Sequence, residues 1–269
     1  MYTFIKFGGS VITDKRGQEA PDLPLITQLA HELAQARQVR PDLALILGHG
    51  SGSFGHHYAA RYGIHRGLAP GSDYQGFAQT AAAALRLNRI VVDALLAAGL
   101  PALALQPSAS IQARAGQIVT WATDNLAQAL EHQLIPVVHG DVAFDSAQGS
   151  CIISTEVLLA HLAHHTSLRP QRIILVGEAG IFSADPRRDP QAQRIPLITT
   201  ANLASVLNAT GASHAVDVTG GMRSKLELMW QLVQAIPNLE VHLIGPAPGQ
   251  LQAALLGTAQ DVGTIIRER

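Results

Sequence analysis

The alternation of short aliphatic runs with longer stretches of helical periodicity is the feature of this chain that most constrains its fold. Residues 43–47 are apolar at every position, as expected for a strand buried on both faces of a parallel sheet. Residues 22–38 instead carry their apolar side chains at close to helical spacing. This alternation is typical of a parallel sheet with crossover helices. We therefore predict an α/β fold, a three-layer sandwich in which helices cover both faces of a mostly parallel central sheet.

The predicted elements run through the whole chain, so we treat residues 1–269 as a single domain. A polar, proline-containing loop near residues 167–172 marks a soft boundary between an N-terminal lobe, residues 1–166, and a C-terminal lobe, residues 167–269. Strands are expected at 4–7, 43–47, 101–105, 135–138, 173–176, 241–244 and 263–266, and helices at 22–38, 76–98, 125–132, 155–164, 200–207 and 223–235.

Composition excludes several classes of protein. Lys plus Arg number 19 against 20 Asp plus Glu, so the chain lacks the basic excess of a nucleic-acid-binding protein. A hydrophobic content of 47% with 14% charged residues excludes a disordered chain. The single cysteine, Cys151, cannot form an intramolecular disulfide, which is typical of the reducing cytosol.

The chain shows no export signal, because its start is typical of a strand that runs into a glycine turn. Its most apolar stretch, residues 90–105, is interrupted by Asp93, Gly99 and Pro101 and falls short of the ~20 residues that span a bilayer. We expect a cytoplasmic protein that contacts neither nucleic acid nor membrane.

Glycines gather where the first two strands are expected to end, at Gly8-Gly9-Ser10 and within residues 48–56. Glycine lets backbone N–H groups approach an anion, and a following helix adds positive potential. Two such turns at neighbouring strand ends indicate two phosphate-sized anions side by side. For either turn alone, an ordinary tight turn between strand and helix is an equally good interpretation.

Two common nucleotide-binding motifs fit the chain poorly. The spacing Gly50-x-Gly52-x-x-Gly55 matches the dinucleotide fingerprint, which also needs an acidic residue about 20 residues later, at the end of the next strand. Asp73 lies at that distance but in a loop, so the Rossmann interpretation is weak. No Walker A sequence occurs.

Lys6, Lys15 and Lys225 each accompany a glycine turn, although lysines are few in this chain. Lys6 lies inside the apolar first strand, where a buried ammonium without an anionic partner is costly. A ligand phosphate is therefore its expected partner. A solvated surface position remains a plausible alternative for Lys15, less so for Lys225 and least for Lys6.

Asp141 and His56 are two further candidates. Asp141 follows the strand at 135–138 in His139-Gly140-Asp141, where it could orient the lysines or hold a metal through water. A turn or N-cap aspartate is an equal alternative. His56 ends the second glycine loop, where a substrate phosphate is expected.

In this order, these motifs resemble the amino-acid-kinase superfamily and, within it, the isopentenyl phosphate kinases. The resemblance extends through nearly the whole chain. The histidine that ends the glycine loop discriminates, because relatives that act on carboxylates or UMP lack it. The matching segments are residues 6–10 with Lys15, 50–56, 139–142, 184–186, and 217–222 with Lys225.

The resemblance implies ATP-dependent phosphorylation of isopentenyl phosphate to isopentenyl diphosphate, a step of isoprenoid biosynthesis. ATP with Mg²⁺ is then the expected cofactor, and no protein residue is assigned as a metal ligand. Dimethylallyl phosphate is a second expected acceptor, and a homodimer is usual in the family. An acceptor phosphate that is already ionised needs no general base.

The resemblance also implies roles for individual residues. Lys6, Lys15 and Lys225 would stabilise charge on the transferring phosphoryl group. His56 would hold the acceptor phosphate, with N–H groups presented by Gly50, Gly55 and Gly140. Phe77 and Ala84 would form the wall of an apolar pocket for the prenyl tail, with core packing an equal alternative for each. The expected ATP-binding residues are Lys6, Gly8, Gly9, Ser10, Ser51, Glu178, Gly221 and Lys225.

Three positions depart from the family pattern. Ser51 stands where glycine is common, which is tolerated if its φ is negative. Glu156, in Ser154-Thr155-Glu156, replaces the aspartate of a usual Ser-Gly-Asp, so no metal- or phosphate-orienting role is assigned to it. Near Glu178, this chain lacks the aspartate that the family usually has before a glycine. Either Glu178 makes that contact with the nucleotide instead, or the part of the site that binds adenosine differs.

Two other functions stay open at this point. One is a kinase of the same fold that acts on another small phosphate or phosphonate, such as a fosfomycin-type resistance enzyme. The other is a nucleotide- or metabolite-sensing module without catalysis, which has no need of the three lysines.

Overall fold

The computed structural model describes residues 2–14, 16–69, 71–184, 186, 189–211, 221–259 and 261–269. Its helices are α1 (Gly9–Ile12), α2 (Leu23–Val39), α3 (Gly52–Tyr62), α4 (Gln75–Ala97), α5 (Asp124–Glu131), α6 (Thr155–His165), α7 (Leu203–Gly211), α8 (Gly221–Ala235) and α9 (Gln250–Leu256). Its strands are β1 (Tyr2–Phe7), β2 (Ala44–His49), β3 (Ala102–Ala104), β4 (Ile111–Arg114), β5 (Gln117–Trp121), β6 (Ile135–His139), β7 (Asp141–Asp145), β8 (Gly149–Ile153), β9 (Pro170–Val176), β10 (Ile181–Phe182), β11 (Arg194–Ile195), β12 (Leu197–Ile198), β13 (Glu240–Ile244) and β14 (Thr264–Ile266).

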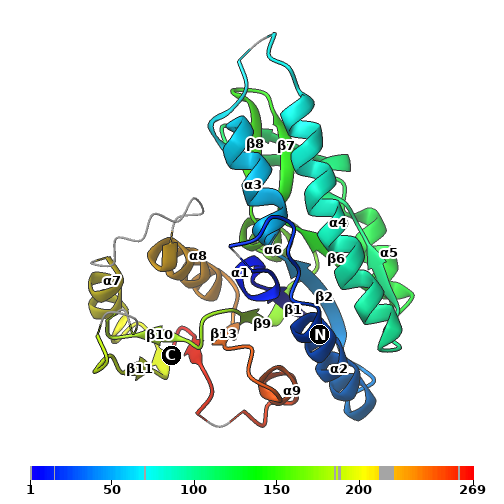
Figure 1. The fold of residues 1–269 in the computed structure, drawn as a ribbon. Helices are drawn as coiled ribbons and strands as arrows, with labels where there is room; N and C mark the ends of the chain where they lie inside the picture. Colours follow the sequence, from blue (N-terminus) through cyan, green and yellow to red (C-terminus); the bar gives the residue numbers. More distant parts are fainter. Residues whose placement is uncertain are drawn as a thin grey trace.

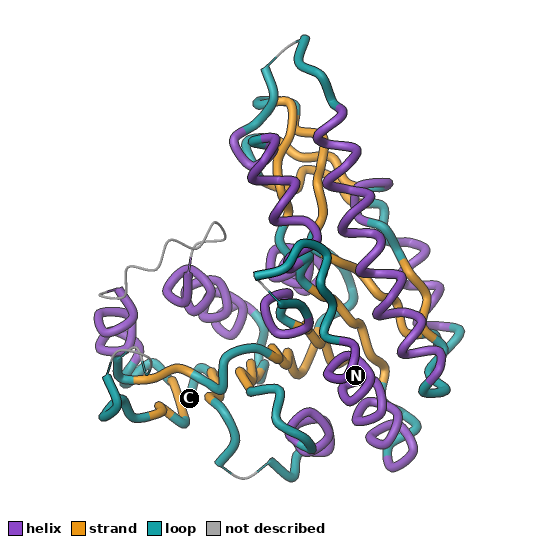
Figure 2. The backbone as a smooth tube through the Cα atoms, viewed as in Figure 1, coloured by secondary structure: helices purple, strands orange, loops and turns teal. Residues whose placement is uncertain are grey.

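The main sheet has eight strands in the order β12-β14-β13-β9-β1-β2-β6-β3. All neighbouring pairs are parallel except β13 and β14. Helices lie on both faces of this sheet, as Figure 1 and the tube of Figure 2 show. The predicted three-layer α/β fold with a mostly parallel sheet is therefore confirmed.

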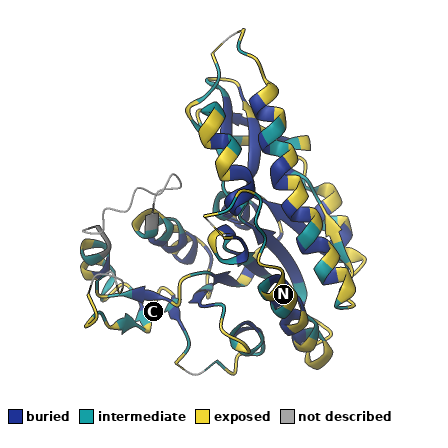
Figure 3. Ribbon diagram, in the orientation of Figure 1, coloured by how far each residue is buried: buried dark blue, intermediate teal, exposed yellow. Residues whose placement is uncertain are grey.

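Side chains of the central strands alternate between two apolar layers, because successive residues of a strand point to opposite faces. Phe4 packs with Leu158 of α6 and Trp230 of α8 on one face. Ile5 packs with Leu33 of α2 and Leu87 of α4 on the other. Figure 3 shows the strands buried between helices whose outer faces are exposed. Burial on both faces explains why these strands are apolar at nearly every position.

The sheet is continuous across the predicted boundary at residue 167, because β9 pairs with β1 in register from Thr3–Arg172 to Phe7–Val176. The two predicted lobes thus share one sheet. By the family resemblance, the N-terminal lobe, residues 1–166, is expected to bind the acceptor phosphate and the C-terminal lobe, residues 167–269, to bind ATP, and both assignments stay predictions.

A second, antiparallel-rich sheet, β5-β4-β7-β8, was not predicted. It projects beyond the main sheet beside α3 and the start of α4 (Figure 1). The Asp145 carboxylate connects the two hairpin turns of this sheet. It accepts hydrogen bonds from the N–H groups of Ala115 and Gly116 at 2.9 and 2.7 Å, and from those of Ala147 and Gln148 at 2.9 and 3.1 Å.

Helices α3 and α9 were also missed, and the helix predicted at 200–207 begins later, at Leu203. The segment that forms α3 was interpreted only as a glycine loop, but its helix starts at Gly52, inside that loop. None of the described helices is long and apolar enough to cross a membrane.

Candidate active site

The site lies where β1, β2, β6 and β9 end, because the carboxyl ends of parallel strands meet at one edge of the sheet. Phe7 is in register with His49, and His49 with His139, so the turns that follow these strands are neighbours. A Cβ added at Gly9 would lie 2.5 Å from the Gly52 nitrogen, and one added at Gly50 would lie 2.7 Å from the Gly9 nitrogen. The first two glycine turns therefore pack directly against each other.

The N–H groups of three glycines have backbone partners in this structure. Gly50 N donates to Phe7 O at 3.0 Å, Gly55 N to Ser51 O at 3.2 Å and Gly140 N to His49 O at 3.0 Å. The hydrogen bonds after Phe7 and His49 continue the sheet ladder beyond the strands. Donation of these N–H groups to an acceptor phosphate stays a prediction, and the glycines keep the floor of the site free of side chains.

A large open pocket occupies this edge of the sheet, with about 1060 Å³ of empty space that includes solvent at its mouth. It brings together most of the residues predicted for the site from widely separated parts of the chain. The predicted residues that line it are Lys6, Gly8, Gly9, Ser10, Gly50, Ser51, His56, Gly140, Glu178 and Lys225. Ser51 has a φ of -77°, so the expectation that serine is tolerated there is confirmed.

Glu156 lies between the two described lysines of the pocket. Its Oε1 accepts a hydrogen bond from Lys6 Nζ and lies 3.9 Å from Lys225 Nζ. Burial alone would raise the pKa of Glu156, but the charges of Lys6 and Lys225 outweigh it, and the pKa lies below its usual value. The ionised carboxylate thus holds the two ammonium groups together and offsets one of their two positive charges.

Sequence reasoning did not assign this role to Glu156. The residue sits in the first turn of α6, after the Ser154 side chain caps the helix by accepting Val157 N–H at 3.3 Å. The cap fixes where the helix begins and so aims Glu156 at β1. Ser154, directly before the helix predicted at 155–164, is an N-cap signal, but it indicates only where the helix begins and not the contacts with the lysines.

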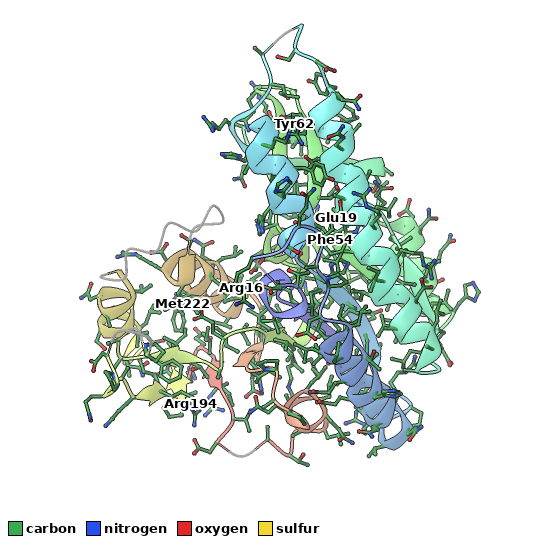
Figure 4. All side chains as sticks on the ribbon, in the orientation of Figure 1. Arg16, Glu19, Phe54, Tyr62, Arg194 and Met222 are labelled. Atoms are coloured by element: carbon green, nitrogen blue, oxygen red, sulfur yellow. The ribbon has the colours of Figure 1, made fainter. Side chains whose placement is uncertain are left out.

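Some predicted positions fall on residues that the structure does not describe. Lys15 and Asp185 lie outside the described residues, as does the segment 212–220 that precedes α8. Gly221 is the first residue of α8, and Met222 beside it lines the large pocket (labelled in Figure 4).

A second pocket, with about 510 Å³ of empty space, adjoins the first. Ser51, His56, Gly140 and Ile152 line both pockets, so the exposed His56 stands at their junction. Among the predicted residues, Gly55 and Ala84 also line the second pocket. The rest of its described wall consists of Ala59, Ala60, His65, Thr80 and Asp141.

Phe77 is not among the described residues that line this pocket. It is buried with Ile64 and Val142 in a small apolar cluster and stacks on Phe144, with ring centroids 4.6 Å apart. Ile152, which lines the pocket, packs against the same cluster. Phe77 therefore lies behind the pocket wall, and contact with an acceptor stays a prediction for it and for Ala84.

The Asp141 carboxylate is bonded to backbone N–H groups, although the sequence suggested that it could orient the lysines or hold a metal through water. Its carboxylate accepts N–H groups of Ser108 at 3.1 Å and Val142 at 2.8 Å, and burial raises its pKa. His139 Nε2 lies 3.6 Å from the same carboxylate. Glu156 contacts the two described lysines, whereas Asp141 binds backbone N–H groups at the start of β7.

The pocket holds paired lysines and adjoins an exposed histidine and a small apolar chamber. This arrangement suits a phosphoryl-transfer site, and the comparison with known proteins supports it. Residues 1–244 match the model of the amino acid kinase family. The chain belongs to this family. The predicted resemblance to the amino acid kinases is therefore confirmed.

Individual relatives share nearly their whole length with the chain. The isopentenyl phosphate kinase of Methanothermobacter thermautotrophicus is 36% identical over 262 residues, which cover 94% of each chain. That of Haloferax volcanii is 32% identical over 267 residues, 98% of this chain and 97% of the relative. A crystal structure of isopentenyl phosphate kinase superposes with a TM-score of 0.82 at 33% identity and covers 99% of this chain and 100% of the other.

Proposed function

We propose that this member of the amino acid kinase family transfers the γ-phosphoryl group of ATP to isopentenyl phosphate. The position of His56 carries the proposal, since it stands between the pocket of paired lysines and a small chamber of mainly apolar surface. A phosphate held there would face the lysines while an apolar tail occupied the chamber. The relatives with identities of 36% and 32%, both isopentenyl phosphate kinases, support the same acceptor.

In the proposed reaction an oxygen of the acceptor phosphate attacks the γ-phosphorus of ATP. The new P–O bond forms as the bond between the γ-phosphorus and its bridging oxygen breaks, and ADP leaves. Charge on the transferring group is then spread over oxygens that Lys6 and Lys225 can reach, and such stabilisation is the main catalytic work in phosphoryl transfer. Lys15 is proposed to join them.

Glu156 keeps the two described ammonium groups in place when no nucleotide is bound. Two lysines of like charge at one site would otherwise repel each other, and the carboxylate offsets one of the charges. Because the acceptor phosphate is already ionised, no general base is needed. The glycines of the first two turns leave room for the triphosphate, with Ser10, Ser51 and Glu178 around it.

Mg²⁺ is proposed to arrive with ATP and to neutralise the charge of the phosphates. Among the described residues, no group of three or more His, Cys, Asp or Glu side chains is arranged to hold a metal. Following the family, we further propose that the enzyme is a homodimer and also accepts dimethylallyl phosphate. We propose a cytoplasmic location as well, because the buried single cysteine fits a reducing compartment.

The role of His56 is tested by His56→Ala. We expect the KM for isopentenyl phosphate to rise at least tenfold while the KM for ATP changes less than twofold, measured from ADP release. His31→Ala, which removes an exposed histidine of α2, is the control. Unchanged KM and kcat in His56→Ala would remove the histidine from acceptor binding.

A further inference from the structure

Thr155, the first residue of α6, is a buried polar residue at the wall of the large pocket. Its hydroxyl donates a hydrogen bond to the backbone carbonyl of His49, the last residue of β2, at 2.6 Å. The two residues lie 106 positions apart in the chain. The bond therefore ties the beginning of the helix directly to the end of a central strand.

Two glycines leave the space that this side chain occupies. A Cβ added at Gly48 would lie 2.4 Å from Thr155 Cγ2, and one added at Gly140 would lie 3.4 Å from Thr155 Oγ1. The absence of a side chain at Gly48 thus makes room for the methyl group over the backbone of β2. Because a β-branched side chain is stiff at χ1, holding both of its branches also holds the backbone that carries them.

The carbonyl that accepts this bond is itself held in place. Gly140 N also donates to His49 O, at 3.0 Å, so one carbonyl joins the ends of β2 and β6 to α6. In the ring of His49, Nδ1 lies 3.0 Å from Gly50 O, and it carries the ring proton because a carbonyl can only accept. Nε2 then accepts from Asn88 Nδ2 at 3.1 Å. Burial lowers the pKa of His49 to about 3, so the ring is neutral at physiological pH.

Glu156 follows Thr155 directly, so the placement of one residue controls the placement of the other. Its Oε1 accepts a hydrogen bond from Lys6 Nζ and lies 3.9 Å from Lys225 Nζ. The Ser154 cap fixes where α6 begins along the chain, but a cap within the helix does not fix where the helix lies relative to the sheet. The bond from Thr155 to β2 supplies this second constraint.

We propose that Thr155 is a positioning residue, whose bond with the His49 carbonyl sets the Glu156 carboxylate between the two described lysines of the pocket. This inference rests on the proposed function for its effect on catalysis. The hydroxyl proton of Thr155 is engaged by the carbonyl, so the residue acts through Glu156 and not through a bond to the reactants.

The kinetic test separates the hydroxyl of Thr155 from its methyl group. Thr155→Val keeps the shape of the side chain and removes the hydroxyl, whereas Thr155→Ser keeps the hydroxyl and removes the methyl group. We expect kcat to fall about three- to tenfold in Thr155→Val, the equivalent of one lost hydrogen bond, while the KM for ATP stays within about twofold. Thr155→Ser should keep kcat within about twofold of the parent, because it retains the bond.

Thr166→Val is the matched control at the other end of the same helix. The Thr166 hydroxyl donates to Leu162 O at 2.6 Å, a bond of the same length as the one from Thr155. Its oxygen also accepts from Leu168 N at 3.0 Å, so the control loses at least as many hydrogen bonds. We expect its kcat to stay within about twofold of the parent, because no bond between α6 and β2 is lost.

A second measurement, thermal denaturation at pH 7, does not depend on activity. Glu156→Gln is made in the parent, in Thr155→Val and in Thr166→Val, and its cost in Tm is compared. If Thr155 positions Glu156, this cost should fall to less than about half in the Thr155→Val background and stay unchanged in the Thr166→Val background. A merely structural role of Thr155 gives additive losses, with the same cost in all three backgrounds.

The outcomes separate this inference from the proposed function. An enzyme that phosphorylates neither isopentenyl phosphate nor any other acceptor refutes the proposed function, while a reduced cost of Glu156→Gln in Thr155→Val still supports the positioning. An undiminished cost overturns the positioning. A reduced cost with parental kcat in an active enzyme overturns its effect on catalysis. Equal losses of kcat in Thr155→Val and Thr155→Ser overturn the role of the hydroxyl bond.

Discussion

Replacement of Glu156 by glutamine removes a carboxylate that contacts both described lysines of the large pocket. Removing one partner of a buried ion pair costs roughly 3–5 kcal/mol, because the remaining charge stays buried. The side chain of Lys225 is 34% exposed and the pocket is open to water, so screening reduces this figure. We therefore expect a loss of about 2 kcal/mol in the free energy of unfolding. For a domain of this size that lowers Tm by about 4–8 °C.

The pH dependence has a definite sign. The folded-state pKa of Glu156 lies below its usual value, so its contribution to stability is present above the unfolded-state pKa of about 4.3. That contribution is lost as the pH falls through the folded-state pKa. Thermal denaturation should therefore show the full difference between parent and Glu156→Gln at pH 6–8 and a shrinking difference below about pH 4.3.

Kinetics give a second signature of the same variant. Glutamine leaves one more net positive charge in the pocket, so ATP binding should not weaken, and the KM for ATP should stay equal or fall. We expect kcat to fall about tenfold, equivalent to about 1.4 kcal/mol, because Lys6 and Lys225 lose the group that positions them. Glu131→Gln, an exposed substitution at the end of α5, is the control. A variant with parental Tm at pH 7 and parental kcat would refute the assigned role of Glu156.

Two further predictions concern other parts of the molecule. If Lys15 stabilises the transferring phosphoryl group, Lys15→Met should lower kcat at least a hundredfold and change the KM for ATP less than threefold. Steady-state assays at saturating acceptor measure both constants. A variant with parental turnover would exclude Lys15 from catalysis. Asp145→Asn should cost about 2 kcal/mol in urea denaturation, because four backbone N–H groups lose a charged acceptor. Although burial opposes it, these bonds lower the pKa of Asp145, so the difference should vanish as the pH falls below that pKa; a difference that is independent of pH would contradict this account.

The central sheet was predictable because its strands are buried on both faces, which leaves uninterrupted runs such as residues 43–47 and 173–176. The gathering of Lys6, Gly50 and Gly140 was predictable for a related reason. Lys6 lies next to the end of a predicted parallel strand, Gly50 and Gly140 follow such strands, and parallel strands end at a common edge.

The small sheet was missed because its strands are only four or five residues long and lack the uninterrupted apolar runs of the central strands. The turn at Ala115-Gly116 connects β4 and β5, and both of its residues have positive φ, as in a tight hairpin. The prediction relied on long apolar runs and did not consider this turn. The pairing of Glu156 with Lys6 could not be read from the chain, since 150 positions separate the two residues and only the packing of α6 on β1 brings them together.

The hydrogen bonds of the glycine turns were likewise not predictable from the sequence. Gly50 and Gly140 line the large pocket, and in this structure their N–H groups continue the sheet ladder. The sequence pattern indicated where backbone is exposed to the pocket. It could not indicate which N–H groups the neighbouring strand had already engaged.

The most direct test of the central claim is ADP release by the unmodified enzyme with Mg-ATP and a panel of acceptors. The panel contains isopentenyl phosphate, dimethylallyl phosphate, fosfomycin, UMP, glutamate and N-acetylglutamate. The account predicts that isopentenyl phosphate is turned over with the highest kcat/KM, because only a phosphate with a short apolar tail satisfies both His56 and the adjoining chamber. Activity on another acceptor with none on either prenyl phosphate would contradict the proposed substrate, and ATP binding without turnover of any acceptor would contradict catalysis itself.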